Sequence, residues 1–232
     1  MTMPDDLSTL GEKPFADAVV KLEELLAQSC RAFLIGAGCS KCAGLPLTAG
    51  LTEEALSSDA LDGTTKAILT AICDLFDGAA DANIEDYLSE LIDLLAIADR
   101  RTSRGATQKD ITLGGVSYSD AQLRAAADQI KRGIAGVIEK KVSIEIHQSF
   151  VGAVHRPRRL GKPTSGETVD YIVLNYDTLL EDALALERVT FADGLDGGVT
   201  GWWRPETFDR DGLAARVFKL HGSINWCEFP DD

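Results

Sequence analysis

The sequence has little positive charge and lacks the patterns that mark membrane or secreted proteins. Its 232 residues include 23 Lys and Arg against 37 Asp and Glu, a formal net charge of −14. A general nucleic-acid binder needs a positive face for the phosphates, so the charge disfavours that class. No apolar run reaches 18 residues, so no membrane span is expected. The acidic N-terminus, MTMPDDLSTLGEKPF, has no apolar segment typical of a signal peptide.

The cysteines lack a zinc-binding pattern. The five cysteines include one C-x-x-C pair, Cys39 and Cys42, and no second pair. A structural zinc site usually takes two such pairs or a Cys/His set, so no zinc is expected. The pair is a candidate redox site, although its place among glycines favours small-residue packing. This cysteine usage favours a reduced, cytoplasmic setting. Apolar residues at 45% and charged residues at 26% are typical of a folded chain.

Three short apolar runs predict the strands of a parallel sheet. They lie at residues 32–35, 169–174 and 216–220, and each is followed by a glycine-containing or polar turn. The first run is continuously apolar, which is typical of a strand buried on both faces by helices, and the other two are similar runs that include Asp170, Arg216 and Lys219. The carboxyl ends of such strands share one edge, where α/β proteins bind their ligands. We therefore expect an α/β fold with a Rossmann-like parallel sheet flanked by helices.

Helical spacing of apolar residues fills most of the remaining chain. Asn83 and Asp86 form an N-cap arrangement at the start of the clearest helix. Residues 101–118 are rich in Gly, Ser and Thr and are predicted to form a loop. The predicted helices cover residues 14–26, 64–76, 84–98 and 120–154. The domain therefore spans 14–232 after a flexible segment at 1–13, with a helical insertion at about 52–165.

Two surface features keep more than one interpretation. The basic run at 156–162 is most often a solvated loop, but it is also a candidate contact for a partner protein or for nucleic acid held by one. Trp202 and Trp203 fit an interface patch and core packing about equally well.

The first strand leads directly into a glycine-rich loop, G-A-G-C-S-K-C-A-G-L-P, at residues 36–46. Glycines after a buried strand let backbone amides approach a phosphate closely, and a helix beyond them adds its positive N-terminal end. The dinucleotide fingerprint G-x-G-x-x-G is only half met, because Lys41 stands at its third position. A tight turn without a ligand is the alternative.

Polar residues follow the other two strands. Asn175 and Asp177 come after the second, and His221 comes after the third. An amide can position a hydroxyl or a water, and an imidazole can accept a proton near neutral pH. The alternatives are a strand-ending turn at 175–177 and a core histidine at 221.

Together, the three motifs resemble the sirtuin family. The glycine loop is similar to that family's opening NAD-binding loop. L-N-Y-D-T-L-L-E at 174–181 resembles the second motif, and L-H-G-S at 220–223 resembles the motif with the catalytic histidine. The resemblance covers roughly residues 30–226.

The resemblance implies roles for particular residues. Asn175 would position a ribose hydroxyl or the attacking water, His221 would accept the proton, and Asp177 would contact the nicotinamide carboxamide. The remaining NAD-binding candidates are Gly36, Ala37, Gly38 and Ser40 at the diphosphate, Leu45, Pro46 and Thr48 near the nicotinamide ribose, and Ser223.

Two departures point to one branch of the family. Leu47, Thr48 and Ala49 stand where the protein deacylases carry Asp-Phe-Arg, and no four-cysteine zinc module is present. The chain resembles the bacterial sirtuin-like NADases of antiphage defence systems, which implies NAD+ hydrolysis, with NAD+ as substrate and no other cofactor. The alternatives are an NAD-dependent protein deacylase and a non-catalytic nucleotide-binding or scaffold module.

The resemblance also implies an assembly. A homo-oligomer with a partner protein is expected, a HerA-type ATPase being favoured over an Argonaute-like protein or another sensor. No direct contact with nucleic acid or membrane is expected. The family fold normally continues beyond the histidine motif, so the resemblance implies either part of a longer protein or a minimal form whose pocket a neighbour completes.

Overall fold

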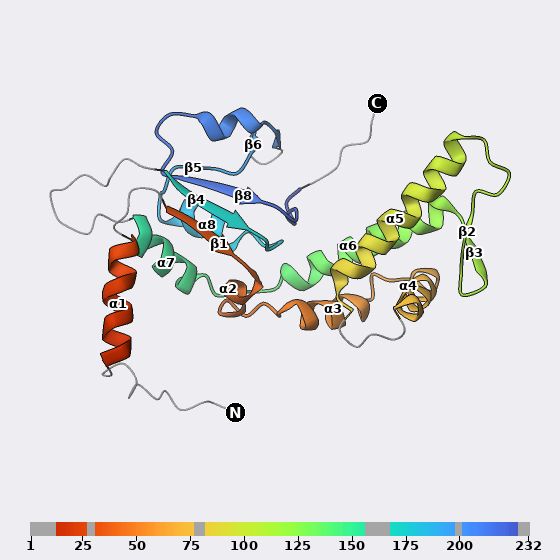
Figure 1. Ribbon diagram of the computed structural model, residues 1–232, viewed down its shortest axis with the longest axis horizontal. Coiled ribbons are helices and arrows are strands. Elements are labelled where there is room, and N and C mark those ends of the chain that lie inside the picture. The colour runs from red at the N-terminus through yellow and green to blue at the C-terminus, as the bar shows by residue number, and fades with distance from the viewer. Residues whose placement is uncertain (1–12, 27–30, 77–81, 156–167, 198–200, 227–232) are drawn as a thin grey trace. The chain divides into compact units, whose positions relative to one another are not determined.

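The computed structural model describes residues 13–26, 31–76, 82–155, 168–197 and 201–226 (Figure 1). The chain divides into two compact units. The sheet unit comprises Met1–Ile35, Ile144–Leu174 and Thr178–Gly222. The helical unit comprises Gly36–Ser143, Asn175–Asp177 and Ser223–Asp232.

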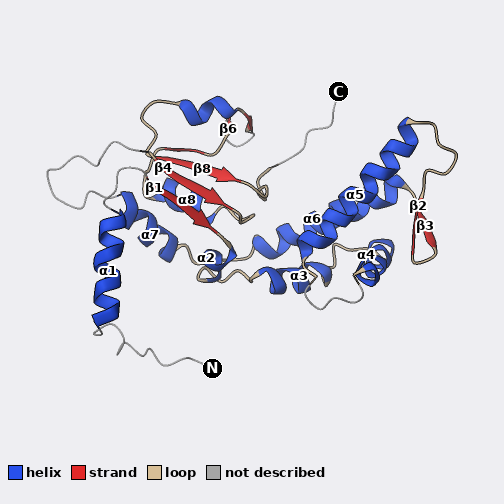
Figure 2. Cartoon of the chain, in the orientation of Figure 1, coloured by secondary structure: helices blue, strands red, loops and turns tan. Residues whose placement is uncertain are grey.

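The sheet unit is built on four parallel strands. Their order is β1 (Arg31–Ile35), β4 (Val169–Val173), β8 (Ala215–Lys219) and β5 (Phe191–Ala192). The three strands predicted from apolar runs are neighbours in it, and helices flank the sheet (Figure 2). The predicted α/β class with a parallel, Rossmann-like sheet is therefore confirmed.

One face of this sheet forms the core of the sheet unit. Two helices pack on it, α7 (Glu145–His155) and α8 (Leu179–Leu186). Tyr171, fully buried at the middle of β4, stacks on Phe33 with ring centroids 5.5 Å apart. The buried members of the cluster are Val151, Val154, Val169, Tyr171, Val173, Leu180, Ala183, Leu184, Ala215 and Val217.

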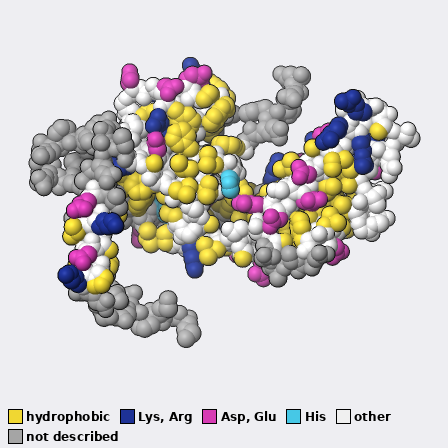
Figure 3. All heavy atoms as spheres, viewed as in Figure 1, with side chains coloured by type: hydrophobic (Ala, Val, Ile, Leu, Met, Phe, Trp, Pro, Cys, Tyr) yellow, Lys and Arg dark blue, Asp and Glu magenta, His cyan; other side chains and the backbone are white. Residues whose placement is uncertain are grey.

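The described residues cover the other face of β1 poorly. Leu34 is 70% exposed and Ala32 is exposed as well, so the prediction that this strand is buried on both faces is wrong for this part of the structure. On β8, Phe218 is covered, because Phe208 of η3 (Pro205–Asp209) stacks on it at 4.7 Å. Figure 3 shows hydrophobic side chains gathered on the visible face of the sheet unit.

A buried ion pair fixes the end of β8. Lys219 Nζ lies 3.3 Å from Glu181 Oε1 on α8, and only 1% and 9% of the two side chains are exposed. A buried charge is tolerated only beside an opposite one, so this pair ties the last residue of β8 to the helix that follows β4.

The two adjacent tryptophans lie in a small hairpin. Trp202 and Trp203 form β7 (Trp202–Trp203), which pairs antiparallel with β6 (Leu195–Asp196). Gly194 and Gly197 have φ of +86° and +101°, and a Cβ built on them would lie 2.1 Å from the Trp203 ring and 2.3 Å from the Trp202 ring respectively. Each ring therefore covers a glycine, while 55% of Trp202 and 58% of Trp203 stay exposed.

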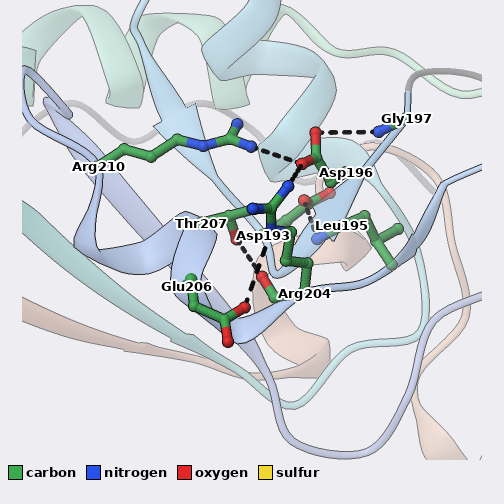
Figure 4. A network of polar contacts seen from close by, with 8 residues as sticks. All are labelled: Asp193, Leu195, Asp196, Gly197, Arg204, Glu206, Thr207 and Arg210. Atoms are coloured by element: carbon green, nitrogen blue, oxygen red, sulfur yellow. Dashed lines mark hydrogen bonds and ion pairs between the residues drawn. The ribbon is translucent and has the colours of Figure 1, made fainter.

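Asp196 anchors the polar side of this hairpin (Figure 4). Its Oδ2 accepts hydrogen bonds from Arg204 at 3.0 Å and from Arg210 at 2.8 Å. The hydrogen bond from Arg210, with further help from Arg204, lowers the pKa of Asp196 below its ordinary value.

The helical unit consists mainly of α2 (Ala37–Lys41), α3 (Thr48–Leu56), α4 (Gly63–Leu75), α5 (Ile84–Ser103) and α6 (Asp120–Ile138). The predicted helices at 64–76 and 84–98 correspond to α4 and α5. Asn83 and Asp86 form the predicted capping box. Helix α6 packs against α3, α4 and α5. Helices α4, α5 and α6 together contribute these large, fully buried side chains: Ile68, Ile72, Ile84, Leu91, Leu123 and Ile130.

Two predictions for this region need correction. The predicted loop at 101–118 contains the end of α5 and a hairpin of β2 (Ile111–Leu113) and β3 (Val116–Tyr118). Gly114 and Gly115, with φ of +55° and +80°, make its two-residue turn. The predicted helix at 120–154 is two helices, α6 and α7. The connection contains Val142, Ser143 and Ile144, which are weaker helix formers, and Ser143 N donates to Ala43 O in place of a helical carbonyl.

The predicted N-terminal helix is α1 (Lys13–Leu26). Most of the predicted flexible segment at 1–13, and the basic run at 156–162, lie outside the described residues. Within the described ranges, no helix has both the length and the apolar character needed to cross a membrane.

The first testable prediction concerns His155, at the end of α7. Its Nε2 lies 2.9 Å from the Tyr171 hydroxyl, and burial, with the nearby charge of Arg31, lowers the pKa of His155 to about 4. In the unfolded chain a histidine titrates near pH 6.5. Between these values the unfolded chain binds more protons, so the free energy of unfolding falls as pH falls from about 6.5 to about 4.

Between pH 7 and pH 5 we expect the free energy of unfolding to fall by about 1 kcal/mol less in His155→Gln than in the wild-type chain, after allowance for solvent screening. The measurement is urea unfolding followed by circular dichroism at both pH values. Tyr171→Phe is the control, because it keeps His155 buried beside Arg31 and should retain the loss. An unchanged loss in His155→Gln would contradict the assignment.

Candidate functional site

The glycine loop leaves the sheet directly after β1. Gly36 is extended, and the first turn of α2 closes on it through a 2.9 Å hydrogen bond from Cys39 N to Gly36 O. A Cβ built on Gly36 or Gly38 would meet no atom within 4 Å, so the described residues leave space beside both glycines. Gly44 has φ of +102°, which a residue with a side chain rarely adopts, and it turns the chain toward α3.

Three of the predicted site residues form one buried hydrogen-bonded cluster in the helical unit. Asn175 Nδ2 donates to Ser40 Oγ at 2.5 Å and to Gly36 O at 3.1 Å. Ser40 Oγ in turn donates to Asp177 Oδ2 at 2.6 Å. The three side chains are buried, with Ser40, Asn175 and Asp177 only 3%, 7% and 8% exposed. We call Ser40, Asn175 and Asp177 the polar cluster.

Only the nitrogen of the Asn175 carboxamide has hydrogen-bond partners among the described residues. Both hydrogen bonds that it makes within the described residues come from Nδ2, and its Oδ1 is buried without a donor there. An unsatisfied buried acceptor costs about 1–3 kcal/mol, so nearly all such groups have a partner. The carboxamide is held in a fixed orientation, with its oxygen left for a hydroxyl or a water.

The chain around Tyr176, between the two cluster residues, is held from two sides. Its backbone oxygen accepts from Ile224 N at 2.9 Å and from Ser223 Oγ at 3.3 Å. Its hydroxyl donates to Glu85 Oε1 of α5 at 3.4 Å. Burial, with the charge of Glu85, raises the pKa of Tyr176 to about 12, so the phenol stays protonated at neutral pH. Ser223, predicted to bind substrate, thus contacts the segment that carries Asn175 and Asp177.

The other predicted residues of the loop occupy different environments. Ala37 is half-buried and Gly38 exposed within α2. Leu45 is buried, Pro46 is half-buried and Thr48 is exposed at the first residue of α3. The structure therefore brings Gly36, Ser40, Asn175 and Asp177 into direct contact. Leu45 N donates to Ser40 O at 3.2 Å, whereas no hydrogen bond among the described residues links Pro46 or Thr48 to the polar cluster.

His221 belongs to the sheet unit and is exposed. It follows β8 by two residues, as Asn175 follows β4, and the last residues of these strands, Val173 and Lys219, are register partners. The two side chains thus come after equivalent ends of neighbouring parallel strands. The core-histidine alternative for His221 is wrong, because that residue is exposed.

Two contacts beside the polar cluster were not predicted from the sequence. Glu85 lies in the first turn of α5, where an acidic residue favours the helix N-terminus by itself, so its contact with Tyr176 has no sequence signal. Cys39 lies close enough to Asp177 for the carboxylate to raise the cysteine pKa, after the larger effects of burial and of Cys42. The described residues contain no group of three His, Cys, Asp or Glu side chains that could hold a metal ion.

No protein-family model matches the chain, and no curated protein sequence matches it at a significant level. The resemblance to sirtuin-like domains therefore stays a prediction from the three motifs.

The second testable prediction concerns the hydroxyl at the centre of the polar cluster. Ser40→Ala removes the acceptor of Asn175 and the donor to Asp177 together, so we expect the free energy of unfolding to fall by about 1–3 kcal/mol. Urea unfolding followed by circular dichroism measures it. Ser103→Ala is the matched control, because Ser103 makes one exposed hydrogen bond to Arg100 O and should cost less than about 0.5 kcal/mol. Equal effects of the two substitutions would contradict a structural role for Ser40.

Proposed function

We propose that the protein is an NAD+ glycohydrolase, which cleaves NAD+ to nicotinamide and ADP-ribose. The observation that carries the proposal is Asn175, a buried carboxamide that Ser40 and Gly36 orient and whose acceptor oxygen has no donor among the described residues. Such a group suits a ribose hydroxyl or a water. The space beside Gly36 and Gly38 supports the approach of a diphosphate to the loop backbone.

The proposed reaction needs no covalent bond between the substrate and the protein. The nicotinamide nitrogen is cationic in NAD+, so breaking its bond to the ribose carbon releases a neutral ring. The transition state is oxocarbenium-like, as in glycoside hydrolysis. The oxygen of water forms the new bond to that carbon, and one proton is released. The protein must hold the dinucleotide, orient the water and accept the proton.

The proposed roles follow from these needs. Asn175 accepts a hydrogen bond from the attacking water or a ribose hydroxyl and thereby positions it. Asp177 offers negative charge toward the developing cation and contacts the nicotinamide carboxamide. His221, exposed after β8, accepts the proton. The rotation of Asn175 is restricted by two donated hydrogen bonds, which lowers the entropy cost of positioning its partner.

The third testable prediction addresses this chemistry. With NAD+ and any activating partner, we expect release of nicotinamide and ADP-ribose, measured by liquid chromatography. Asn175→Ala and His221→Ala should each lower the rate by about 10²–10⁴-fold, the range for loss of a positioned acid, base or orienting group. Gln108→Ala, which removes an exposed amide outside the site, should keep the wild-type rate.

Several outcomes would overturn the proposal. Full activity in Asn175→Ala and His221→Ala would refute the assigned roles. Removal of acetyl groups from a lysine peptide that depends on NAD+, with no hydrolysis of NAD+ when the peptide is absent, would indicate a deacylase. Binding of ADP-ribose with no turnover under any activating condition would indicate a nucleotide-binding or scaffold module.

We also propose that the protein is the effector of a bacterial antiphage defence system. An enzyme that depletes NAD+ harms its own cell, so its activity must be held off until needed. The proposal therefore includes a homo-oligomer and a partner protein, with a HerA-type ATPase favoured over an Argonaute-like protein or another sensor.

The fourth testable prediction is that turnover depends on this assembly. Light scattering after size exclusion should give a mass above one chain, and NAD+ hydrolysis should rise when the product of a neighbouring gene is added. The control is the partner with the Asn175→Ala chain. A monomer with full activity on its own would refute the dependence on assembly.

A further inference from the structure

The two cysteines of the C-x-x-C pair lie on one turn of helix. Cys39 is in α2, and Cys42 caps that helix with helical backbone angles, φ −68° and ψ −20°. Residues three apart in a helix have Cα atoms about 5 Å apart and lie on one face, and this Cα separation falls within the range that a disulfide requires. The thiol of Cys42 is turned back toward Cys39, since its Sγ donates to Cys39 O at 2.8 Å.

Neither thiol is in a disulfide, and the two differ in access to solvent. Cys42 is exposed and Cys39 is half-buried. Between them stand Ser40 and Lys41, so the pair brackets the serine at the centre of the polar cluster.

We propose that Cys39 and Cys42 form a reversible dithiol–disulfide pair, and that its oxidation restrains the helical turn that carries Ser40. The oxidant is hydrogen peroxide. This redox site goes beyond the proposed NAD+ chemistry and does not depend on it.

The reaction balances in two steps. The Cys42 thiolate attacks one peroxide oxygen, the S–O bond forms as the O–O bond breaks, and the leaving oxygen departs as water after protonation. Cys39 then attacks the Cys42 sulfur, the S–S bond forms, and the sulfenic oxygen leaves as a second water. Two thiols are oxidised by two electrons in total, and one peroxide is reduced to two waters.

The order of these steps follows from the surroundings of the two thiols. Burial, then the neighbouring Cys42 and Asp177, raise the pKa of the Cys39 thiol. A raised pKa lowers the thiolate fraction, and burial limits access by the oxidant. The exposed Cys42 therefore meets the peroxide first, and Cys39 resolves the intermediate.

Formation of the disulfide affects the turn that carries Ser40. A disulfide that closes a four-residue loop restricts the open conformations of that loop. Opening of this turn would separate Ser40 Oγ from Asn175 and Asp177, so the oxidised chain keeps the polar cluster assembled for a larger fraction of the time.

The fifth testable prediction uses the position of Lys41. Trypsin cleaves after Arg31, Lys41 and Lys66, which puts Cys39 in peptide 32–41 and Cys42 in peptide 42–66. After peroxide treatment, alkylation and digestion, we expect mass spectrometry to find these two peptides joined, and dithiothreitol to separate them. Cys73→Ser is the matched control and should leave the joined peptides unchanged. Separate, alkylated peptides after oxidation would overturn the proposal, as would peptide 32–41 or 42–66 joined to the peptide of another cysteine.

Two single variants test the order of attack. In Cys39→Ser, peroxide should leave a sulfenic acid on Cys42 that dimedone labels. In Cys42→Ser, labelling of Cys39 should be slower. Faster labelling of Cys39 would overturn the assigned order.

Hydrogen exchange tests the restraint itself. The amides of residues 40–44 should exchange about tenfold more slowly in the oxidised chain than in the reduced chain, whereas those of α5 should not change. Equal exchange at residues 40–44 in both forms would show that the disulfide forms without restraining Ser40, and would overturn that half of the proposal.

Discussion

A single buried hydroxyl joins two distant parts of the chain. Ser40 Oγ accepts from Asn175 and donates to Asp177, so one atom of the loop after β1 binds two side chains of the segment after β4, and the bond from Asn175 to Gly36 O adds to this. The three side chains are buried, each less than 9% exposed, so bulk water does not replace these bonds. The residues on both sides must therefore fold together, since either one alone would leave buried polar groups unsatisfied.

This constraint explains how a short segment between a strand and a helix is placed. Asn175–Asp177 belong to the helical unit although β4 and α8 on either side belong to the sheet unit. Ser40 holds the segment by its side chains, and Ser223 and Ile224 hold it by the backbone oxygen of Tyr176. Three motifs that are far apart in the sequence thus supply the residues of one hydrogen-bonded arrangement.

Much of the fold is predictable where local signals agree. The apolar runs of β1, β4 and β8 and the capping box of Asn83 and Asp86 depend on neighbours in the sequence. The hairpin of β2 and β3 was hidden because its strands have only three residues each, within a stretch rich in Gly, Ser and Thr. The exposure of Leu34 was unpredictable, because an unbroken apolar run contains no information about which face is covered.

The candidate site also has features that the sequence predicts and features that it does not. Motif order predicted that Ser40, Asn175 and Asp177 matter, but not that the hydroxyl lies between the amide and the carboxylate. The contact of Tyr176 with Glu85 joins residues 91 positions apart and leaves no local pattern. Distances of this kind depend on packing, which a single sequence does not encode in any local signal. His221 shows the opposite case, since its place after β8 is predictable from the strand alone.

The hairpin of β6 and β7 has an optical consequence. Two of the three tryptophans, Trp202 and Trp203, lie over glycines there, and the third, Trp226, is 41% exposed. The fluorescence of this chain therefore arises at its surface and reports on the hairpin and on the turn after β8. The tryptophan emission should be sensitive to solvent quenchers in the folded state and should change little with the packing of the core around Tyr171.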